Sequence, residues 1–175
     1  MPFTYLLSNE DCDHVLTFWD EETSLKSTKY LSKKIDEVNT INFRTRAKGR
    51  YMDINNPDLN SFLLPKLRPI GIVNLPEYVK IAKYSQGDYF EPHHDFNFYG
   101  KGHVYKTLVI QLTDPNTYKG GDFYVGKDPK SRFRGDYSLF LSSEIHEVKP
   151  IEEGTRFSLT IFLEESDFIQ TKSAI

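Results

Sequence analysis

The sequence lacks several features that would assign it to whole classes of protein. Its 175 residues include one cysteine, Cys12, so an intramolecular disulfide and a cysteine-rich zinc site are both excluded. No apolar run approaches the roughly 20 residues of a membrane-spanning helix. The opening residues MPFTYLLSNEDCDH have no basic segment followed by a long apolar one, which predicts no secretory signal peptide. We therefore expect a cytoplasmic protein with no membrane partner.

The sequence also lacks a strong net charge and any sign of a domain boundary. The formal net charge is -3, which argues against a general nucleic-acid-binding surface. The sequence has no repeat and no linker rich in proline, glycine or serine, and its length suits one domain. We therefore predict a single domain over residues 1–175, in which about residues 1–75 support a core at residues 79–165.

Aromatic residues are abundant and favour β-structure. With 13 Phe and 11 Tyr, the aromatic share is 14%, and such side chains suit half-buried pleated surfaces. From residue 79 onward, short strand-like segments alternate with turn residues. The segments are VKIAKY (79–84), SQGDYFEPHHDF (85–96), KTLVIQLTD (106–114), GGDFYVG (120–126), DYSLFLS (136–142), IHEVKPI (145–151) and TRFSLTIFLEE (155–165). Seven such segments predict a β-sandwich or barrel.

Two helices are predicted in the first part of the chain. Ser8 is a suitable N-cap for an amphipathic helix over residues 9–20, whose first turn is acidic. A second helix is predicted over residues 57–67, with Pro57 at a favoured first-turn position, although Pro65 lies in its interior. Helices before strands on one chain predict a mainly β, α+β fold in which the helices pack outside a β core.

His93 and Asp95 are the first candidates for a metal site. Residues two apart on a strand project from the same face, so these two side chains can take neighbouring corners of a coordination sphere, while His94 points the other way. His146 opens a later strand-like segment and can supply a third ligand. Two histidines and one carboxylate with open positions are typical of non-haem Fe(II) oxygenases. The alternative is that both histidines are core residues satisfied by hydrogen bonds.

Arg156 is the candidate for binding an anion. The alternation in GTRFSLT places Arg156, Ser158 and Thr160 on one face, and a guanidinium inside a barrel needs a partner because an unpaired buried charge is very costly. A carboxylate ligand is a natural partner, since the planar guanidinium binds it through two parallel hydrogen bonds. Tyr84 could donate a further hydrogen bond to that carboxylate, and Gln111 is a weaker candidate for the pocket. The alternatives are an exposed arginine on an edge strand and a core tyrosine.

An ordered series of motifs runs through the second half of the chain. The series is Tyr84-x-x-Gly87, His93-x-Asp95, Leu112-Thr113-Asp114, Tyr118-x-Gly120-Gly121-Asp122-Phe123, His146-x-Val148-x-Pro150-Ile151 and Gly154-Thr155-Arg156. With these motifs the chain resembles the prolyl 4-hydroxylase-like branch of the Fe(II)/2-oxoglutarate-dependent dioxygenases, close to the small bacterial and viral prolyl/lysyl hydroxylase type. The resemblance covers about residues 79–164 well and the first 75 residues loosely.

The resemblance implies a double-stranded β-helix (jelly-roll) core with supporting N-terminal helices. It implies that Fe(II) is bound by His93, Asp95 and His146. It also implies that Arg156 pairs with the distal carboxylate of 2-oxoglutarate and that Tyr84 assists. The implied reaction consumes O2, converts 2-oxoglutarate to succinate and hydroxylates a C–H bond, chemistry that the cofactor carries. Several members of the family also require ascorbate.

Three hypotheses for the function follow. The one we favour is a hydroxylase acting on proline or lysine within a peptide or protein. The second is the same oxygenase chemistry on a small molecule such as a free amino acid, metabolite or nucleobase. The third is a non-catalytic jelly-roll binding module, against which the intact set of candidate site residues argues.

Two regions are candidates for contacting a substrate. The first is the aromatic stretch after the metal motif, which contains Phe96, Phe98, Tyr99, His103 and Tyr105. The second is the basic loop GKDPKSRFRG, which contains Lys127, Lys130, Arg132 and Arg134. Charged runs such as this loop and KSTKYLSKK at residues 26–34 are, however, more often solvated surfaces than binding sites.

Overall fold

The strand-like segments from residue 79 onward all contribute strands, and these pair in antiparallel sheets. The computed structural model describes residues 5–27, 30–31, 44–95 and 104–170. The larger sheet has six strands, in the order β1 (Leu25–Lys26), β5 (Arg50–Ile54), β6 (Val79–Tyr84), β15 (Arg156–Leu163), β8 (Lys106–Gln111) and β12 (Tyr137–Leu141). The smaller sheet has the order β11 (Asp128–Pro129), β10 (Phe123–Val125), β13 (His146–Val148), β7 (Tyr89–His93) and β4 (Ala47–Lys48).

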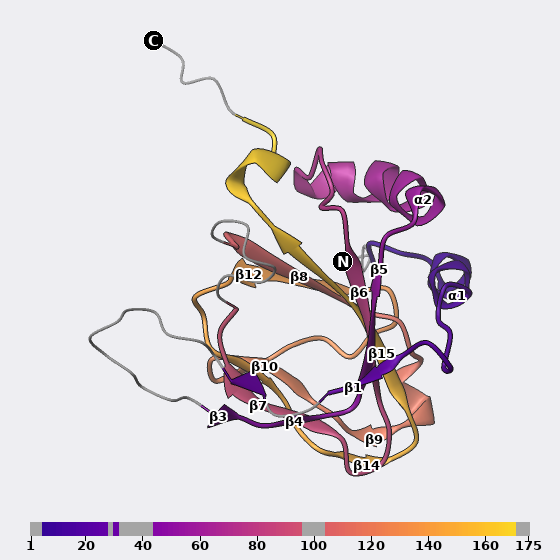
Figure 1. Cartoon of the computed structure of the whole chain (residues 1–175), viewed down its shortest axis with the longest axis vertical. Helices are drawn as coiled ribbons and strands as arrows, with labels where there is room; N and C mark the ends of the chain where they lie inside the picture. The colour runs from indigo at the N-terminus through magenta and orange to yellow at the C-terminus, as the bar shows by residue number, and fades with distance from the viewer. Residues whose placement is uncertain (1–4, 28–29, 32–43, 96–103, 171–175) are drawn as a thin grey trace.

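Short pairs and turns complete the β-structure. β14 (Ile151–Glu153) pairs with β9 (Lys119–Gly120), and β2 (Tyr30–Leu31) pairs with β3 (Arg44–Thr45). Single-turn 3-10 helices in the described part of the chain are η1 (Arg68–Ile70), η3 (Pro115–Thr117) and η4 (Glu165–Asp167). Figure 1 shows the smaller sheet lying across from the larger one, with the two α-helices outside.

The larger sheet therefore separates two cores. The interior core lies between the sheets and joins side chains of both, among them Tyr84 and Phe140 from the larger sheet and Phe123 and Val148 from the smaller one. The outer core lies between the larger sheet and the helices. Its buried side chains include Leu59, Leu63, Ile81, Leu108, Ile110, Leu159 and Ile161. β15 directs side chains to both sides of the sheet, because successive residues on a strand point to opposite faces.

The two α-helices match the predicted ranges except at the C-terminal end of α1. α2 (Pro57–Leu67) has the predicted bounds, with Asn56 as its N-cap, and it continues through Pro65. α1 (Asn9–Leu16) begins at the predicted residue and has a capping box at Ser8. The prediction that this helix reaches residue 20 is wrong, because the chain tightens after Leu16 into a turn that directs Trp19 onto Phe157, with ring centroids 5.4 Å apart.

The segment predicted at residues 145–151 is not continuous. It divides into β13 and β14 because the proline at 150 has no N–H to donate to a ladder, while the amides on either side of it bond to the residues just before β10 and β7. The Lys149 amide donates to the Asp122 carbonyl and the Ile151 amide to the Asp88 carbonyl, both at 2.9 Å. The strand therefore ends soon after His146 and turns toward a second partner.

Among the described residues, no helix combines the length and the apolar character needed to cross a membrane. The expected cytoplasmic location stays a prediction. So does the division of the chain into a supporting part and a core, although β1 and β5 from the first part are strands of the larger sheet.

Candidate active site

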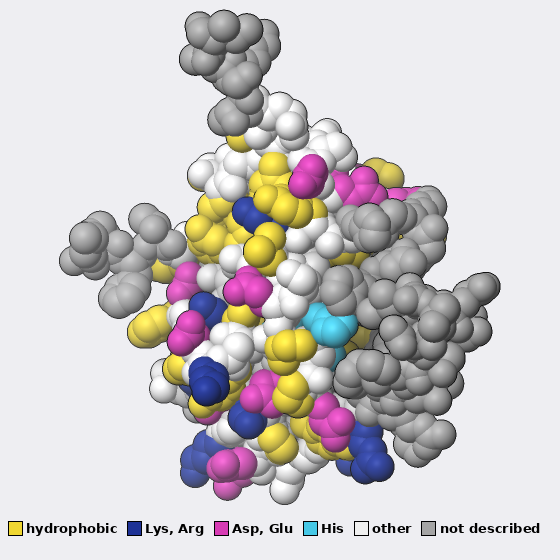
Figure 2. All heavy atoms as spheres, turned by 90° about the vertical axis from the view of Figure 1, so that its left-hand side faces the viewer, with side chains coloured by type: hydrophobic (Ala, Val, Ile, Leu, Met, Phe, Trp, Pro, Cys, Tyr) yellow, Lys and Arg dark blue, Asp and Glu magenta, His cyan; other side chains and the backbone are white. Residues whose placement is uncertain are grey.

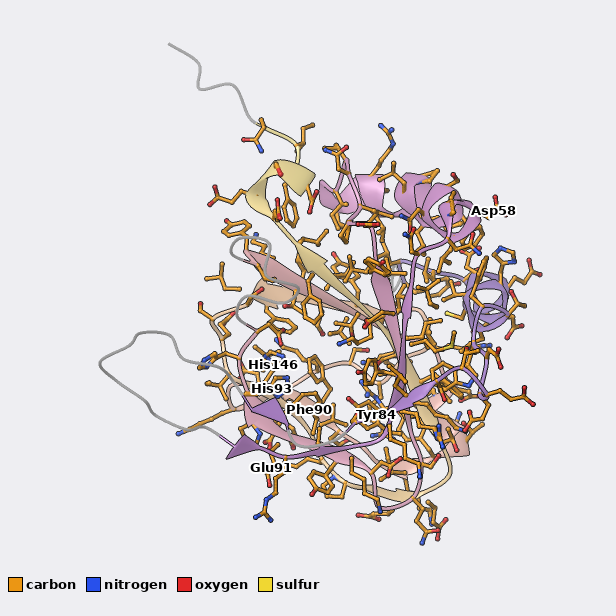
Figure 3. All side chains as sticks on the ribbon, viewed as in Figure 1. Asp58, Tyr84, Phe90, Glu91, His93 and His146 are labelled. Atoms are coloured by element: carbon orange, nitrogen blue, oxygen red, sulfur yellow. The ribbon has the colours of Figure 1, made fainter. Side chains whose placement is uncertain are left out.

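His93, Asp95 and His146 converge inside the barrel. His93 on β7 and His146 on β13 are cross-strand partners, with ring centroids 4.2 Å apart. The Asp95 carboxylate reaches both: Oδ2 lies 3.1 Å from Nε2 of His146, and Oδ1 lies 3.7 Å from Nε2 of His93. One ligand atom from each residue lies within 4.8 Å of the others. Figure 3 shows the two histidines together beside Phe90, with Tyr84 across from them.

Asp95 reaches this position by a route that differs from the expected one. The sequence argument placed His93 and Asp95 on one strand, but β7 ends at His93. The Asp95 amide instead donates to the Ser142 carbonyl at 2.8 Å, just beyond β12. The two side chains nevertheless project to the same side, so the separation of two residues had the predicted consequence.

Both histidines are oriented in the same way. Nδ1 of His93 lies 2.7 Å from the Glu91 carbonyl oxygen, and Nδ1 of His146 lies 2.9 Å from the Glu144 carbonyl oxygen. A carbonyl only accepts, so in each neutral ring Nδ1 carries the proton. The lone pair of each Nε2 then faces Asp95. Outer hydrogen bonds of this kind commonly fix metal-binding histidines.

Asp95 and His93 have further support that the sequence analysis did not assign. The Thr107 hydroxyl, fully buried on β8, donates to Oδ2 of Asp95 at 2.7 Å and lies 3.0 Å from the Ser142 hydroxyl. The Phe90 ring stacks on His93 with centroids 3.6 Å apart. The Thr107 contact joins segments distant in sequence, whereas Phe90 lies on the same strand as His93.

The electrostatics of the cluster favour a cation among the three side chains. Burial, followed by the charge of His146, lowers the pKa of His93 to about 4 against the opposing charge of Asp95. Burial disfavours the Asp95 carboxylate, but hydrogen bonds and both histidines hold its pKa below the ordinary value. Burial also opposes the charge of His146, yet its pKa is raised because the protonated ring can donate from Nε2 to the Asp95 carboxylate. A buried carboxylate and imidazole nitrogens are a donor set that suits Fe(II).

Arg156 lies across the same interior. It is 1% exposed at the start of β15, a central strand, so the alternative of an exposed edge arginine is wrong. Its Nε donates to Oε1 of Gln111 at 3.1 Å, while Nη1 and Nη2 are buried without a hydrogen-bond partner among the residues that the structure describes. Burial lowers the pKa of Arg156, and the nearby Tyr84 and Tyr118 oppose that shift. Two unsatisfied donors on one guanidinium match a carboxylate that accepts both.

Tyr84 faces Arg156 from the neighbouring strand. The two residues are register partners, and the Arg156 Cζ lies 5.5 Å from the Tyr84 ring centroid. Burial raises the pKa of Tyr84 to about 12, so its hydroxyl keeps the proton at neutral pH and can donate it. The predicted residues Tyr84, Gln111 and Arg156 are therefore brought together.

Arg132 holds the segment that carries Tyr118. Its Nη1 donates to the Gly120 carbonyl at 2.8 Å and to Oδ1 of Asp122 at 2.5 Å, and its Cζ lies 4.4 Å from the Tyr118 ring centroid. At Gly120, with φ +73°, a Cβ would collide with the Pro150 carbonyl oxygen, so the turn requires glycine. The turn brings Tyr118 beside Arg156.

The two arginines of the basic loop therefore belong to the fold. Besides Arg132, Arg134 pairs with Asp13 at 2.6 Å and donates to the Leu112 carbonyl at 2.8 Å. Of the two lysines, Lys127 is exposed and Lys130 half-buried. The expectation of a solvated charged surface is wrong for both arginines, because a basic sequence alone does not reveal partners distant in the chain.

The other substrate candidates are described only in part. Phe96, Phe98, Tyr99 and His103 lie outside the described residues, as does most of the run at 26–34. Tyr105 is half-buried against Phe168, with ring centroids 6.0 Å apart. Figure 2 shows histidine side-chain atoms at the surface of the molecule, between hydrophobic side chains and residues that are not described.

The chain matches known proteins over its second half. A family model described as the 2OG-Fe(II) oxygenase superfamily matches residues 79–164. A PKHD-type hydroxylase of Prochlorococcus marinus is 29% identical over 107 residues, which are 59% of this chain and 45% of that protein. A PKHD-type hydroxylase of Maricaulis maris is 27% identical over 85 residues, which are 46% of this chain and 39% of that protein. The chain thus spans less than half the length of these relatives.

Solved structures share the fold. A viral collagen prolyl hydroxylase from Paramecium bursaria Chlorella virus-1, in complex with 2OG, superposes with a TM-score of 0.58 at 16% identity over 90% of each chain. A prolyl-4-hydroxylase of Pseudomonas putida gives 0.57 at 17% identity, over 90% of this chain and 87% of that one. At such identities the likeness speaks for the fold alone, and it confirms the predicted jelly roll.

The family match covers the strands that carry all the candidate residues. Residues 79–164 include Tyr84, the three converging side chains, and Arg156. Fe(II), 2-oxoglutarate and O2 are the metal, co-substrate and oxidant that this family implies. The chain therefore contains a domain of the 2OG-Fe(II) oxygenase superfamily, which spans residues 79–164.

Proposed function

We propose that the chain is a 2-oxoglutarate-dependent dioxygenase that hydroxylates a C–H bond of a peptidyl proline or lysine. The observation that carries the proposal is the pairing of two complementary half-sites in one interior. One half-site is the buried cluster of His93, Asp95 and His146. The other is the Arg156 guanidinium, whose Nη1 and Nη2 have no hydrogen-bond partner among the described residues.

The roles of the residues follow from their contacts. His93, Asp95 and His146 would hold Fe(II), with Thr107 and the Glu91 and Glu144 carbonyls fixing their orientation. Bound there, iron supplies the redox chemistry that couples decarboxylation of 2-oxoglutarate to succinate with hydroxylation of the substrate.

The dicarboxylate would lie against the larger sheet. Arg156 would bind its distal carboxylate through both Nη atoms, and the protonated Tyr84 hydroxyl would donate to the same group. Gln111 accepts from Nε of Arg156 and so keeps the two Nη atoms directed into the pocket. The substrate would occupy the remaining interior beside the metal cluster.

The substrate assignment is supported by the relatives rather than by a contact. Both curated relatives are named PKHD-type hydroxylases, and two neighbours of the same fold are prolyl hydroxylases. A small-molecule substrate is the second candidate. We also propose that residues 1–175 act as one unit, because β1 and β5 extend the larger sheet that carries Arg156.

Succinate formation tests the proposal. Purified protein is incubated with Fe(II), 2-oxoglutarate and O2, and succinate is measured with and without a library of proline- and lysine-containing peptides. We expect succinate to depend on Fe(II) and on His93, so His93→Ala should abolish it. His14→Ala is the matched control, since His14 is exposed on α1. Absence of iron binding and of turnover in the wild type, or full activity of His93→Ala, would overturn the proposal.

Mass spectrometry of the same library tests the substrate. A mass gain of one oxygen atom on proline or lysine supports peptidyl hydroxylation. Iron-dependent succinate without any modified peptide, together with an oxidised amino acid or metabolite in a parallel screen, would replace it with the small-molecule function.

A further inference from the structure

The larger sheet carries an interior row of polar side chains that the proposed iron and 2-oxoglutarate sites do not use. Lys80 on β6 pairs in register with Asp53 on β5 and with Thr160 on β15. Lys80 lies two and four residues before Ala82 and Tyr84, which belong to the interior core, so all three share a strand face. We refer to Asp53, Lys80 and Thr160 as the Lys80 row.

Aromatic rings flank the Lys80 ammonium. Its Nζ lies 5.0 Å from the Tyr51 ring centroid and 5.2 Å from the Phe162 ring centroid. The side chains of Tyr51, Asp53, Lys80, Thr160 and Phe162 are all half-buried. Half-buried polar and aromatic groups on the inner face of a barrel are suited to lining a site that a ligand can enter.

The Lys80 row lies two residues along the sheet from the level of Thr107, which contacts the metal cluster. Phe162, which contacts Lys80, is the register partner of Thr107 on β8, and Thr107 donates to Asp95. Lys80 and Thr107 are two strands apart across the sheet and offset by two residues along it, which separates their backbones by about 12 Å. Arg156 lies four residues before Thr160 on β15, which places it about 13 Å away along the strand. Lys80 thus lies beside the site of chemistry, away from the dicarboxylate end.

Lys80 places a cationic group among half-buried side chains of the interior. Burial lowers the pKa of Lys80, while the charges of Asp53 and Asp95 oppose the shift. A half-buried ammonium attracts an anion more strongly than an exposed one because less water screens the charge. The simplest alternative is that the charge of Lys80 serves only to balance Asp53 across the strands, at a modest gain in stability.

We propose that Lys80 binds a carboxylate of the substrate and so selects acidic substrates. This inference rests on the proposed function and narrows its substrate class. The carboxylate has two possible sources: an acidic side chain next to the target residue in a peptide, or the α-carboxylate of a free amino acid. Tyr51 and Phe162 would pack against the apolar part of the same substrate.

Matched carboxylate and amide probes test the proposal. The first pair is two blocked tetrapeptides in which either Glu or Gln precedes proline, and the second is L-proline and L-prolinamide. Each probe is titrated anaerobically into protein loaded with Fe(II) and 2-oxoglutarate, which reports binding without turnover. We expect the wild type to bind the carboxylate member of one pair about 10-fold more tightly, as a charge-assisted hydrogen bond predicts. The pair that shows the preference identifies the source.

Variants assign the preference to Lys80. Lys80→Met should reduce it to within about twofold, and Lys80→Arg should keep most of it, since the charge remains. Lys80→Gln serves in place of the Met variant if that variant does not fold. Lys83→Met is the matched control, because Lys83 lies on the opposite face of β6 and pairs with Glu21 at 2.9 Å.

The outcomes separate this inference from the proposed function. Equal binding of both members of each pair by the wild type, or an undiminished preference in Lys80→Met, would overturn the role of Lys80. So would a weaker 2-oxoglutarate affinity in Lys80→Met than in Lys83→Met, because Lys80 would then contact the co-substrate. Failure of the proposed function shows separately, as absence of iron-dependent succinate in the wild type.

Discussion

The two faces of the larger sheet are made by the same strands and bury very different groups. On β15, Leu159 and Ile161 face the outer core, while Arg156 and Ser158 face the interior. The outer face packs on α1 and α2 through aliphatic side chains, which are well suited to hold a fold together. The interior face buries a guanidinium with two unpartnered Nη donors among the described residues, an arrangement that does not favour stability. The sheet therefore separates the residues that stabilise the fold from those that we propose to bind ligands.

The largest effect is expected when the charge on the interior face is removed. Arg156→Gln should weaken 2-oxoglutarate binding about 100-fold or more, because it removes two charge-assisted hydrogen bonds. The metal-free protein should be as stable as the wild type or more so, since the variant also removes two buried unsatisfied donors. Calorimetric titration measures the affinity for 2-oxoglutarate, and urea unfolding measures the stability of the metal-free protein. Large destabilisation with intact binding would place Arg156 among the structural residues.

The converse change is made on the outer face of the same strand. Leu159→Ala should lower the free energy of unfolding by about 2–5 kcal/mol, because it leaves a cavity in a fully buried site. Protein that remains folded should bind 2-oxoglutarate within about twofold of the wild type, as expected for distant sites. A loss of affinity as large as that of Arg156→Gln would show that the two faces are not separate.

A smaller effect is expected at Arg132, which supports the pocket without facing it. Arg132→Gln should weaken 2-oxoglutarate binding by about 3- to 10-fold, because the turn that holds Tyr118 beside Arg156 loses its hydrogen bonds. Arg134→Gln, in the same loop, provides the matched control, since Arg134 pairs with Asp13 on α1. Equal effects of the two changes on affinity would remove any positioning role for Arg132.

A last prediction concerns the reactivity of the thiol in the outer core and involves no ligand. Cys12 is fully buried there, and burial raises the pKa of its thiol to about 11. A raised pKa means less thiolate at a given pH, so a thiol reagent at neutral pH should react at least about 100-fold more slowly with native protein than with urea-unfolded protein. Comparable rates would indicate that α1 does not stay packed on the sheet.

Local patterns predicted much of this arrangement. The strands of the jelly roll were readable because short apolar segments alternate with turn residues, and α2 because Pro57 begins an apolar run. The interior position of Arg156 was readable from the alternation along β15. Each of these features depends on neighbours in sequence.

Contacts between segments distant in the chain could not be predicted from the sequence. Thr107 supports Asp95 only because β8 lies beside the chain that follows β7, and Arg132 supports Tyr118 only because a loop folds back. The end of α1 and the break at Pro150 likewise depend on partners elsewhere in the fold. The sequence therefore indicated which candidate residues come together in the interior but not what holds them in place.

The central claim is that one interior holds a divalent metal and a dicarboxylate together. Anaerobic calorimetry of the wild type, His146→Ala and His14→Ala tests it most directly, with 2-oxoglutarate titrated in the presence and absence of Fe(II). We predict one 2-oxoglutarate per chain in the wild type and in His14→Ala, bound more tightly when Fe(II) is present. We predict that His146→Ala loses this dependence on iron. Iron-independent binding in the wild type, or unchanged iron dependence in His146→Ala, would contradict the account.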